Sequence, residues 1–84
     1  MHDSLFRALA DPTRRRILEL LAEGDRTAGD IAEQFPIAFA SVSHHLGVLK
    51  AAGLVESVKQ GIWIYYRLRE DLPPAVGKAL QVLA

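Results

Sequence analysis

His2, His44, His45 and the neighbouring Ser43 have side chains suited to catalysis or metal binding, but their spacing fits neither a catalytic motif nor a metal site. Ser43 lies in no Gly-x-Ser-x-Gly turn, and no acidic residue is evident as a partner for His44. His44 and His45 are adjacent, so on a helix they point about 100° apart and cannot share a metal ion as an i, i+4 pair can. Because the sequence also lacks cysteine and a glycine-rich phosphate loop, we expect neither an enzyme nor a metal or cofactor site.

The same region has the chemistry of a nucleic-acid contact. Val42, Leu46 and Leu49 recur at i, i+4 and i+7, which predicts a helix with one buried apolar stripe. The opposite face and its flanks then carry small or polar residues, namely Ala40, Ser41, Ser43, His44, Gly47, Lys50 and Ala51. Small side chains with hydrogen-bonding groups fit a DNA major groove about 12 Å wide. A plain solvated surface helix would show the same pattern.

Two β-rich runs follow this helix and predict a hairpin. Leu54 to Val58 and Ile62 to Leu68 are separated by Lys59-Gln60-Gly61, where glycine permits a positive φ. Lys59 could reach a phosphate or the minor groove, or the turn could simply be solvated. Residues 36–69 carry four basic residues against one acid, a net charge of +3, whereas the whole chain is formally neutral. Positive charge is therefore concentrated on the predicted helix and hairpin.

Two other conspicuous groups of side chains have structural interpretations. Arg14, Arg15 and Arg16 point in successive directions on one helix, so we expect at least one to pair with an acid such as Glu19. His45, at the edge of the apolar stripe, is expected to be packed and hydrogen-bonded.

The second β-rich run also carries aromatic and basic side chains. Trp63, Tyr65 and Tyr66 are close enough in sequence to cover both faces of the strand, and we expect most of them to pack on the helices. Arg67 and Arg69 are expected to flank the basic surface.

These residues require a mainly α fold with a β-hairpin, in the order α-α-α-α-β-β-α, within a single domain spanning residues 1–84. The expected helices begin and end as follows: Asp3 or Ser4 to about Ala10; Asp11-Pro12 to Gly24; Thr27, with Asp30 completing a capping box, to Pro36; Ala38–Ser41 to Gly53; and Pro73 or Pro74 to about Leu83.

Composition adds an expectation about assembly. Half of the 84 residues are hydrophobic, which is generous for a chain whose size limits how much apolar surface it can bury alone. A homodimer would bury the remainder. No apolar run approaches the roughly 20 residues of a membrane span, and no basic-plus-apolar signal opens the sequence. We therefore expect a cytoplasmic protein.

Several segments resemble the ArsR-type winged-helix repressors, and within them the SdpR-like autorepressors. The matching segments are LADPTRRRILELL, TAGDIAEQF, SVSHHLGVLKAAGLVES and GIWIYYRL, and the resemblance runs from about Phe6 to Leu68. It implies that the third and fourth helices form a helix-turn-helix, that the hairpin is the wing, and that the first and last helices build the homodimer.

By position, the resemblance also implies roles for individual residues. Ser41, Ser43 and His44 would face the major groove. Lys59 and Gln60 would face the backbone or minor groove. The residues implied to face the partner subunit are Leu5, Phe6, Leu9, Val76 and Leu80.

The sequence departs from the family pattern in two places. Metal-sensing members carry cysteines on the third helix or His and carboxylate ligands on the last, whereas the third helix here is AGDIAEQF and no His or acid follows Asp71. The fourth helix opens with Ala38-Phe39-Ala40, in which Ala is a poor N-cap.

We therefore expect a homodimer that binds a roughly palindromic operator in double-stranded DNA and represses transcription. The alternative is a winged helix used as a protein-interaction module, which the near-neutral charge and the apolar start of the fourth helix favour. A small effector in the dimer interface is a further possibility that no residue identifies.

Overall fold

The computed structural model describes residues 2–72 and Val76. Its elements, in chain order, are α1 (His2–Leu9), α2 (Pro12–Glu23), β1 (Arg26–Thr27), α3 (Ala28–Ala32), α4 (Phe39–Ala51), β2 (Val55–Gln60) and β3 (Trp63–Leu68). The first four of the five predicted helices and the hairpin are present in the predicted order. The helix expected from Pro73 or Pro74 to Leu83, including Leu80, lies outside the described residues.

Side-chain caps fix the starts of two helices where the sequence predicted them. The Asp11 carboxylate accepts a hydrogen bond from the backbone N–H of Arg14 at 3.1 Å, with Pro12 opening α2. At α3, the Thr27 hydroxyl accepts from the N–H of Asp30 at 3.1 Å, and the Asp30 carboxylate accepts from the N–H of Thr27 at 3.3 Å. The predicted capping box is thus confirmed.

The end of α4 turns the chain directly into the hairpin. Gly53 has a φ of +77°, and its N–H donates to the carbonyl of Lys50 at 3.0 Å. The N–H of Leu54 donates to the carbonyl of Leu49 at 3.0 Å, which completes a Schellman motif. Leu49 and Leu54 are both buried in the core, so this turn fixes β2 relative to α4.

The sheet has three strands rather than the two that were predicted. Its order is β1-β3-β2, antiparallel throughout, and β1 pairs Arg26 with Tyr66 and Thr27 with Tyr65. A two-residue strand is too short to show the alternation by which strands are recognised in a sequence.

The hairpin turn begins two residues later than predicted and is one residue shorter. β2 runs through Gln60, which pairs with Trp63, so Lys59 and Gln60 belong to the strand. Gly61 and Ile62 form the loop. Gly61 has a φ of +64°, as the first loop position of a type II′ turn requires.

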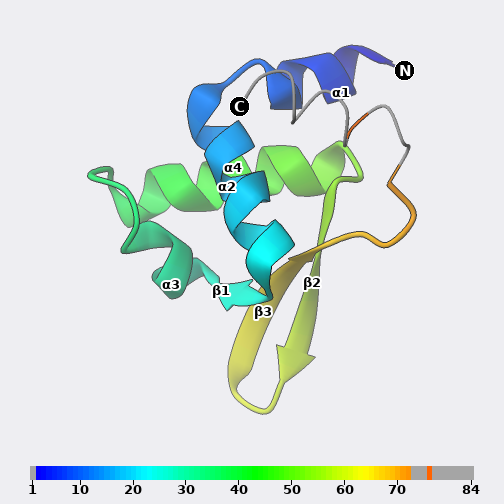
Figure 1. Ribbon diagram of the computed structural model, residues 1–84. Helices are drawn as coiled ribbons and strands as arrows, with labels where there is room; N and C mark the ends of the chain where they lie inside the picture. Colours follow the sequence, from blue (N-terminus) through cyan, green and yellow to red (C-terminus); the bar gives the residue numbers. More distant parts are fainter. Residues whose placement is uncertain (1, 73–75, 77–84) are drawn as a thin grey trace.

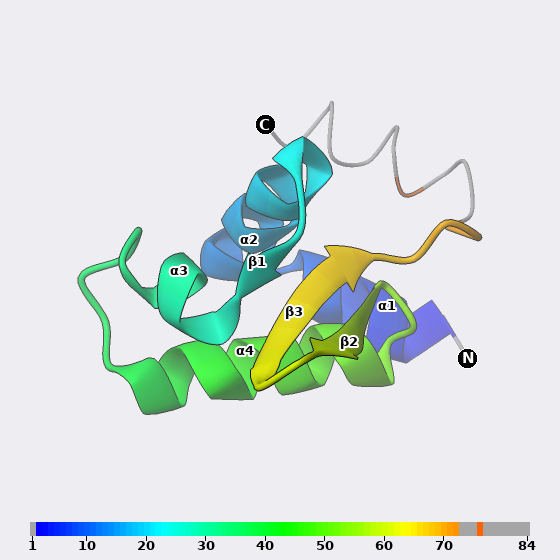
Figure 2. The ribbon, with the colours of Figure 1, turned by 90° about the horizontal axis from the view of Figure 1, so that it is seen from below.

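One hydrophobic core lies between the helices and the base of the sheet. Its buried members are Ala8, Leu9, Ile17, Leu18, Leu21, Ile31, Val42, Leu46, Leu49, Leu54, Val55 and Val76. The hairpin extends beyond this core, below the helices in Figure 1, and α3 lies beside the start of α4 in Figure 2. The arrangement is a winged helix-turn-helix, with α3 and α4 as the helix-turn-helix and β2–β3 as the wing.

Candidate nucleic-acid interface

Helix α4 separates its apolar and polar residues as predicted. Val42, Leu46 and Leu49 are buried. The opposite side is exposed along the whole helix, through Ala40, Ser41, Ser43, His44, Gly47, Lys50 and Ala51. The Ala38 N-cap makes no side-chain hydrogen bond, and Phe39 is 56% exposed. A row of small and polar groups, with one full positive charge, therefore faces outward from α4.

The wing places Lys59 on the same side as α4. In an antiparallel ladder, opposed residues share a face, as do residues two apart on one strand. Ser57 faces α4, because its hydroxyl accepts a hydrogen bond from Lys50 Nζ at 2.9 Å. Lys59, two residues on, lies on that face opposite Ile64. Gln60 lies on the other face with Trp63, so the two predicted wing residues point in opposite directions.

Two of the four predicted basic residues are neutralised within the chain. Arg67 Nε lies 3.2 Å from Glu56 Oε1 across the β2–β3 ladder. Arg69 binds both carboxylate oxygens of Asp71, at 2.9 and 3.0 Å. This hydrogen bonding lowers the pKa of Asp71 and raises that of Arg69. Lys50 and Lys59 remain as cations without an acidic partner among residues 2–72 and 76.

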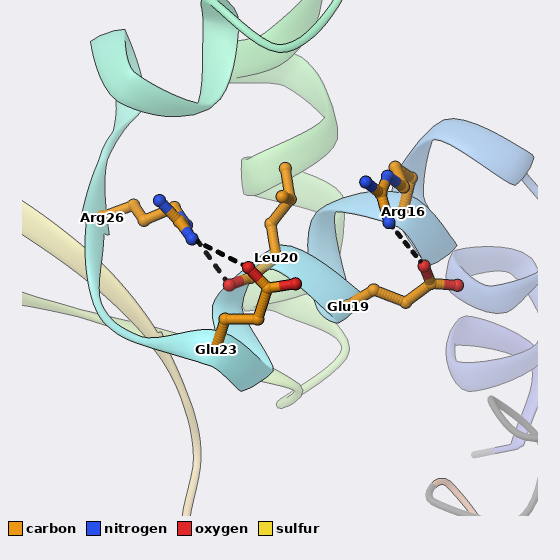
Figure 3. Close-up of polar contacts among 5 residues, drawn as sticks. All are labelled: Arg16, Glu19, Leu20, Glu23 and Arg26. Atoms are coloured by element: carbon orange, nitrogen blue, oxygen red, sulfur yellow. Dashed lines mark hydrogen bonds and ion pairs between the residues drawn. The ribbon is translucent and has the colours of Figure 1, made fainter.

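The arginine run of α2 serves the fold rather than this surface. Arg16 pairs with Glu19 at 2.9 Å, as predicted, on an exposed part of α2 (Figure 3). Arg15 donates to the carbonyl of Leu9 at 2.8 Å, at the end of α1. Arg26 of β1 is used in the same way, reaching the carbonyl of Leu20 and the carboxylate of Glu23, each at 3.2 Å (Figure 3). The guanidinium groups of Arg15 and Arg26 thus satisfy carbonyls near helix ends, while that of Arg16 is held by Glu19.

Arg14 makes a contact that the sequence did not indicate. Its Nη1 lies 3.2 Å from His45 Nδ1, which joins α2 to α4 across 31 positions of sequence. This confirms that His45 is a packed, hydrogen-bonded histidine. Spacing could not reveal its partner, because two helices distant in sequence bring the groups together.

The apolar residues of the wing tip were also missed. Ile62 is 87% exposed and Trp63 is 57% exposed. Most of the three aromatic residues of β3 were expected to pack on the helices, but Trp63 does not, because it lies on the outer face of the strand. Tyr66, on the opposite face, does pack against the core.

The residues expected at a dimer interface have different environments in one chain. Leu9 and Val76 are buried in its core, and Leu5 is partly buried against that core. Phe6 on α1 is 65% exposed. The dimer interface stays a prediction. Among the described residues expected there, Phe6 is the one whose apolar side chain is largely accessible to a partner subunit.

Neither a cluster of metal ligands nor a membrane-spanning helix occurs in the part of the chain that the structure describes. Nowhere in the ranges 2–72 and 76 do three or more His, Asp or Glu side chains gather as metal ligands would. No helix there combines the length and apolar character needed to cross a bilayer.

Comparison with known proteins agrees with this geometry. The sequence model of the family of bacterial regulatory proteins called arsR matches residues 11–57, from the N-cap of α2 into β2. The transcriptional repressor SdpR of Bacillus subtilis is 53% identical over 66 residues, covering 79% of this chain and 73% of SdpR.

Solved structures show the same fold. An ArsR-like transcriptional regulator from Rhodococcus sp. RHA1 superposes with a TM-score of 0.80 at 39% identity, over 98% of this chain and 72% of the other. The homodimeric winged helix-turn-helix DNA-binding domain of a possible ArsR-family regulator from Mycobacterium bovis gives 0.77 at 32% identity, over 95% and 71%. The expectation of a transcriptional regulator rather than an enzyme is confirmed. The chain belongs to the arsR family of bacterial regulatory proteins.

Proposed function

We propose that this protein is a homodimeric repressor that binds a roughly palindromic operator in double-stranded DNA without a metal cofactor. Each protomer places α4 in a major groove, and its wing contacts the adjacent backbone or minor groove. Because a two-fold dimer presents two copies of α4, the half-sites lie about one helical turn apart. Occupation of the operator represses transcription.

The observation that carries the proposal is the exposed face of α4. Ser41, Ser43 and His44 are exposed at its N-terminal half, while the opposite stripe is buried. Serine hydroxyls can hydrogen-bond to bases or phosphates, and an imidazole N–H can donate to a guanine acceptor. Gly47 continues this face with no side chain to hold the helix away from the groove.

The wing adds electrostatic attraction on the same side. Lys59 lies on the face of the wing that faces α4, and Lys50 of α4 reaches that face at Ser57. No described acid neutralises either lysine. Both are placed to approach phosphates, with Gln60 beside the turn as a further polar contact. Phosphate contacts of this kind make the affinity fall as the salt concentration rises.

Dimerisation is supported by the homodimeric Mycobacterium bovis relative and by the exposed Phe6 on α1. Burial of an aromatic side chain is among the larger contributions to an interface. Sedimentation equilibrium should give about twice the mass of the 9.3 kDa chain. Phe6→Ala should shift this equilibrium toward the monomer.

Fluorescence anisotropy on DNA from upstream of the protein's own gene tests the DNA function, since the sequence resemblance to the SdpR-like autorepressors implies self-regulation. Scrambled DNA of the same length is the control, and both are titrated with and without a chelator. We expect tighter binding to the upstream DNA, a steep salt dependence, and no effect of the chelator. Equal binding to both DNAs would refute operator recognition, and absent binding would favour the protein-interaction module.

Three variants then separate sequence recognition from general affinity. Ser43→Ala and His44→Ala should reduce binding to upstream DNA more than to scrambled DNA, because they remove groups aimed at base edges. Ser4→Ala, which removes another exposed helical serine, should leave the ratio unchanged. Equal losses on both DNAs for Ser43→Ala and His44→Ala would place base recognition elsewhere.

A further inference from the structure

The Arg14 guanidinium joins three parts of the chain at one point. Its Nε donates to the carbonyl of Ala8 at 2.9 Å, and its Nη2 donates to the carbonyl of Arg7 at 2.7 Å, so two carbonyls at the end of α1 are satisfied. Its Nη1 reaches His45 Nδ1 on α4 at 3.2 Å. Helix α4 is therefore attached, through one side chain of α2, to the end of α1.

The direction of the third bond determines the state of His45. Arginine has five N–H donors and no acceptor, so His45 Nδ1 must supply the lone pair. In this geometry the ring is neutral and carries its proton on Nε2. A protonated ring has an N–H at both nitrogens and a positive charge facing the guanidinium, so it cannot keep this contact.

We propose that Arg14 is a positioning residue for the recognition helix: it holds α4 to α1 through His45, and protonation of His45 breaks this link and weakens DNA binding. The effect on DNA rests on the function proposed above. The link itself is a property of the fold and can be tested separately.

The surroundings of His45 favour an exchange of partners. Burial raises the pKa of Asp11, the N-cap of α2, but the hydrogen bond from the Arg14 N–H and electrostatic attraction by the positively charged form of His45 lower it overall. Protonated His45 is repelled by Arg14 and attracted by Asp11. Among the described residues, the ring of His44 also lies near, with its centroid 5.9 Å from that of His45 on α4. Protonation would thus favour movement of the His45 ring away from the Arg14 guanidinium toward the Asp11 carboxylate.

The first measurement compares the pH dependence of DNA affinity for the wild type and His45→Gln. Glutamine retains an acceptor for Arg14 but does not titrate. His44 and the DNA are the same in both measurements, so the ratio of the two Kd values reports the change made at His45. From about pH 8 to about pH 5, the range in which histidines act as switches, the wild type should weaken about fivefold or more relative to His45→Gln. A ratio that is constant with pH would overturn the proposal.

The second measurement follows the link by NMR without DNA. At about pH 8, the ring 15N shifts of His45 should show an unprotonated Nδ1. As the pH is lowered toward about pH 5, the amide resonances of Ala8 and Leu9 should shift over the same pH range as the His45 ring resonances. In Arg14→Lys, whose single ammonium cannot hold α1 and His45 together in the same way, these α1 shifts should lose their correlation with His45. The link would be overturned by a protonated Nδ1 at about pH 8, or by α1 amide resonances that do not change as the pH is lowered.

The two measurements distinguish the possible failures. If the wild type binds no DNA at any pH, the proposed function fails and the NMR titration alone decides whether Arg14 links the helices. If the protein binds DNA but the ratio of the Kd values of the wild type and His45→Gln does not change with pH, DNA binding stands and the positioning role is refuted.

Discussion

Replacing Lys59 with alanine removes a wing cation that faces the same side as α4 and has no acidic partner in the described chain. For each B-DNA phosphate that the protein no longer neutralises, the negative slope of log K against log salt concentration becomes shallower by about 0.9. The proposed dimer has two wings, so the slope should become shallower by about 1.8.

This change of slope has a large and specific consequence. Between about 50 mM and about 200 mM salt, the advantage of the wild type over Lys59→Ala should shrink about 12-fold, on both upstream and scrambled DNA. The assay is fluorescence anisotropy at five or so salt concentrations across that range. Circular dichroism checks that the variant is folded, which we expect because Lys59 is exposed at the end of β2.

The matched control is Arg16→Ala, which also removes one positive charge per chain. Arg16 lies on α2 and is paired with Glu19, so its removal should leave the salt slope unchanged. If both variants flatten the slope equally, net charge rather than the wing determines the affinity. If Lys59→Ala keeps the slope of the wild type, the wing does not contact phosphates and the proposed docking is wrong.

Three further changes test the elements that present α4. Burial raises the pKa of Asp11, but the hydrogen bond from the Arg14 N–H and electrostatic attraction lower it overall below its ordinary value. The ionised form of Asp11 therefore stabilises the fold above the unfolded-state pKa, and this stabilisation is lost as the pH falls through the folded pKa. Urea denaturation of Asp11→Ala should show a weaker loss of stability between about pH 5 and about pH 2. Gly47→Ala should raise the free energy of unfolding by about 0.5–1 kcal/mol, because no heavy atom lies within 4 Å of the added Cβ. It should also weaken operator binding, and undiminished affinity would place the DNA elsewhere. Thr27→Ala should cost about 1 kcal/mol of stability in urea denaturation through loss of the capping box, and an unchanged midpoint would contradict that role.

The sequence alone determined the features that depend on residues within a few positions of one another. The stripe of Val42, Leu46 and Leu49 set which face of α4 is exposed, because side chains three or four apart share one side of a helix. Asp11 and Gly53 marked helix ends through bonds that reach no more than five residues. Such short-range geometry is the same wherever the segment lies, so it was predictable.

The tertiary structure alone decided which distant groups meet. β1 pairs Arg26 with Tyr66, and Arg14 reaches His45, although nothing in their spacing indicates either contact. Packing also determined which cations remain available for DNA: Arg67 is paired with Glu56 across the hairpin, whereas Lys59 keeps its charge unpaired by any described acid. Composition counts charges, but their partners depend on which side chains the packed elements bring within bonding distance.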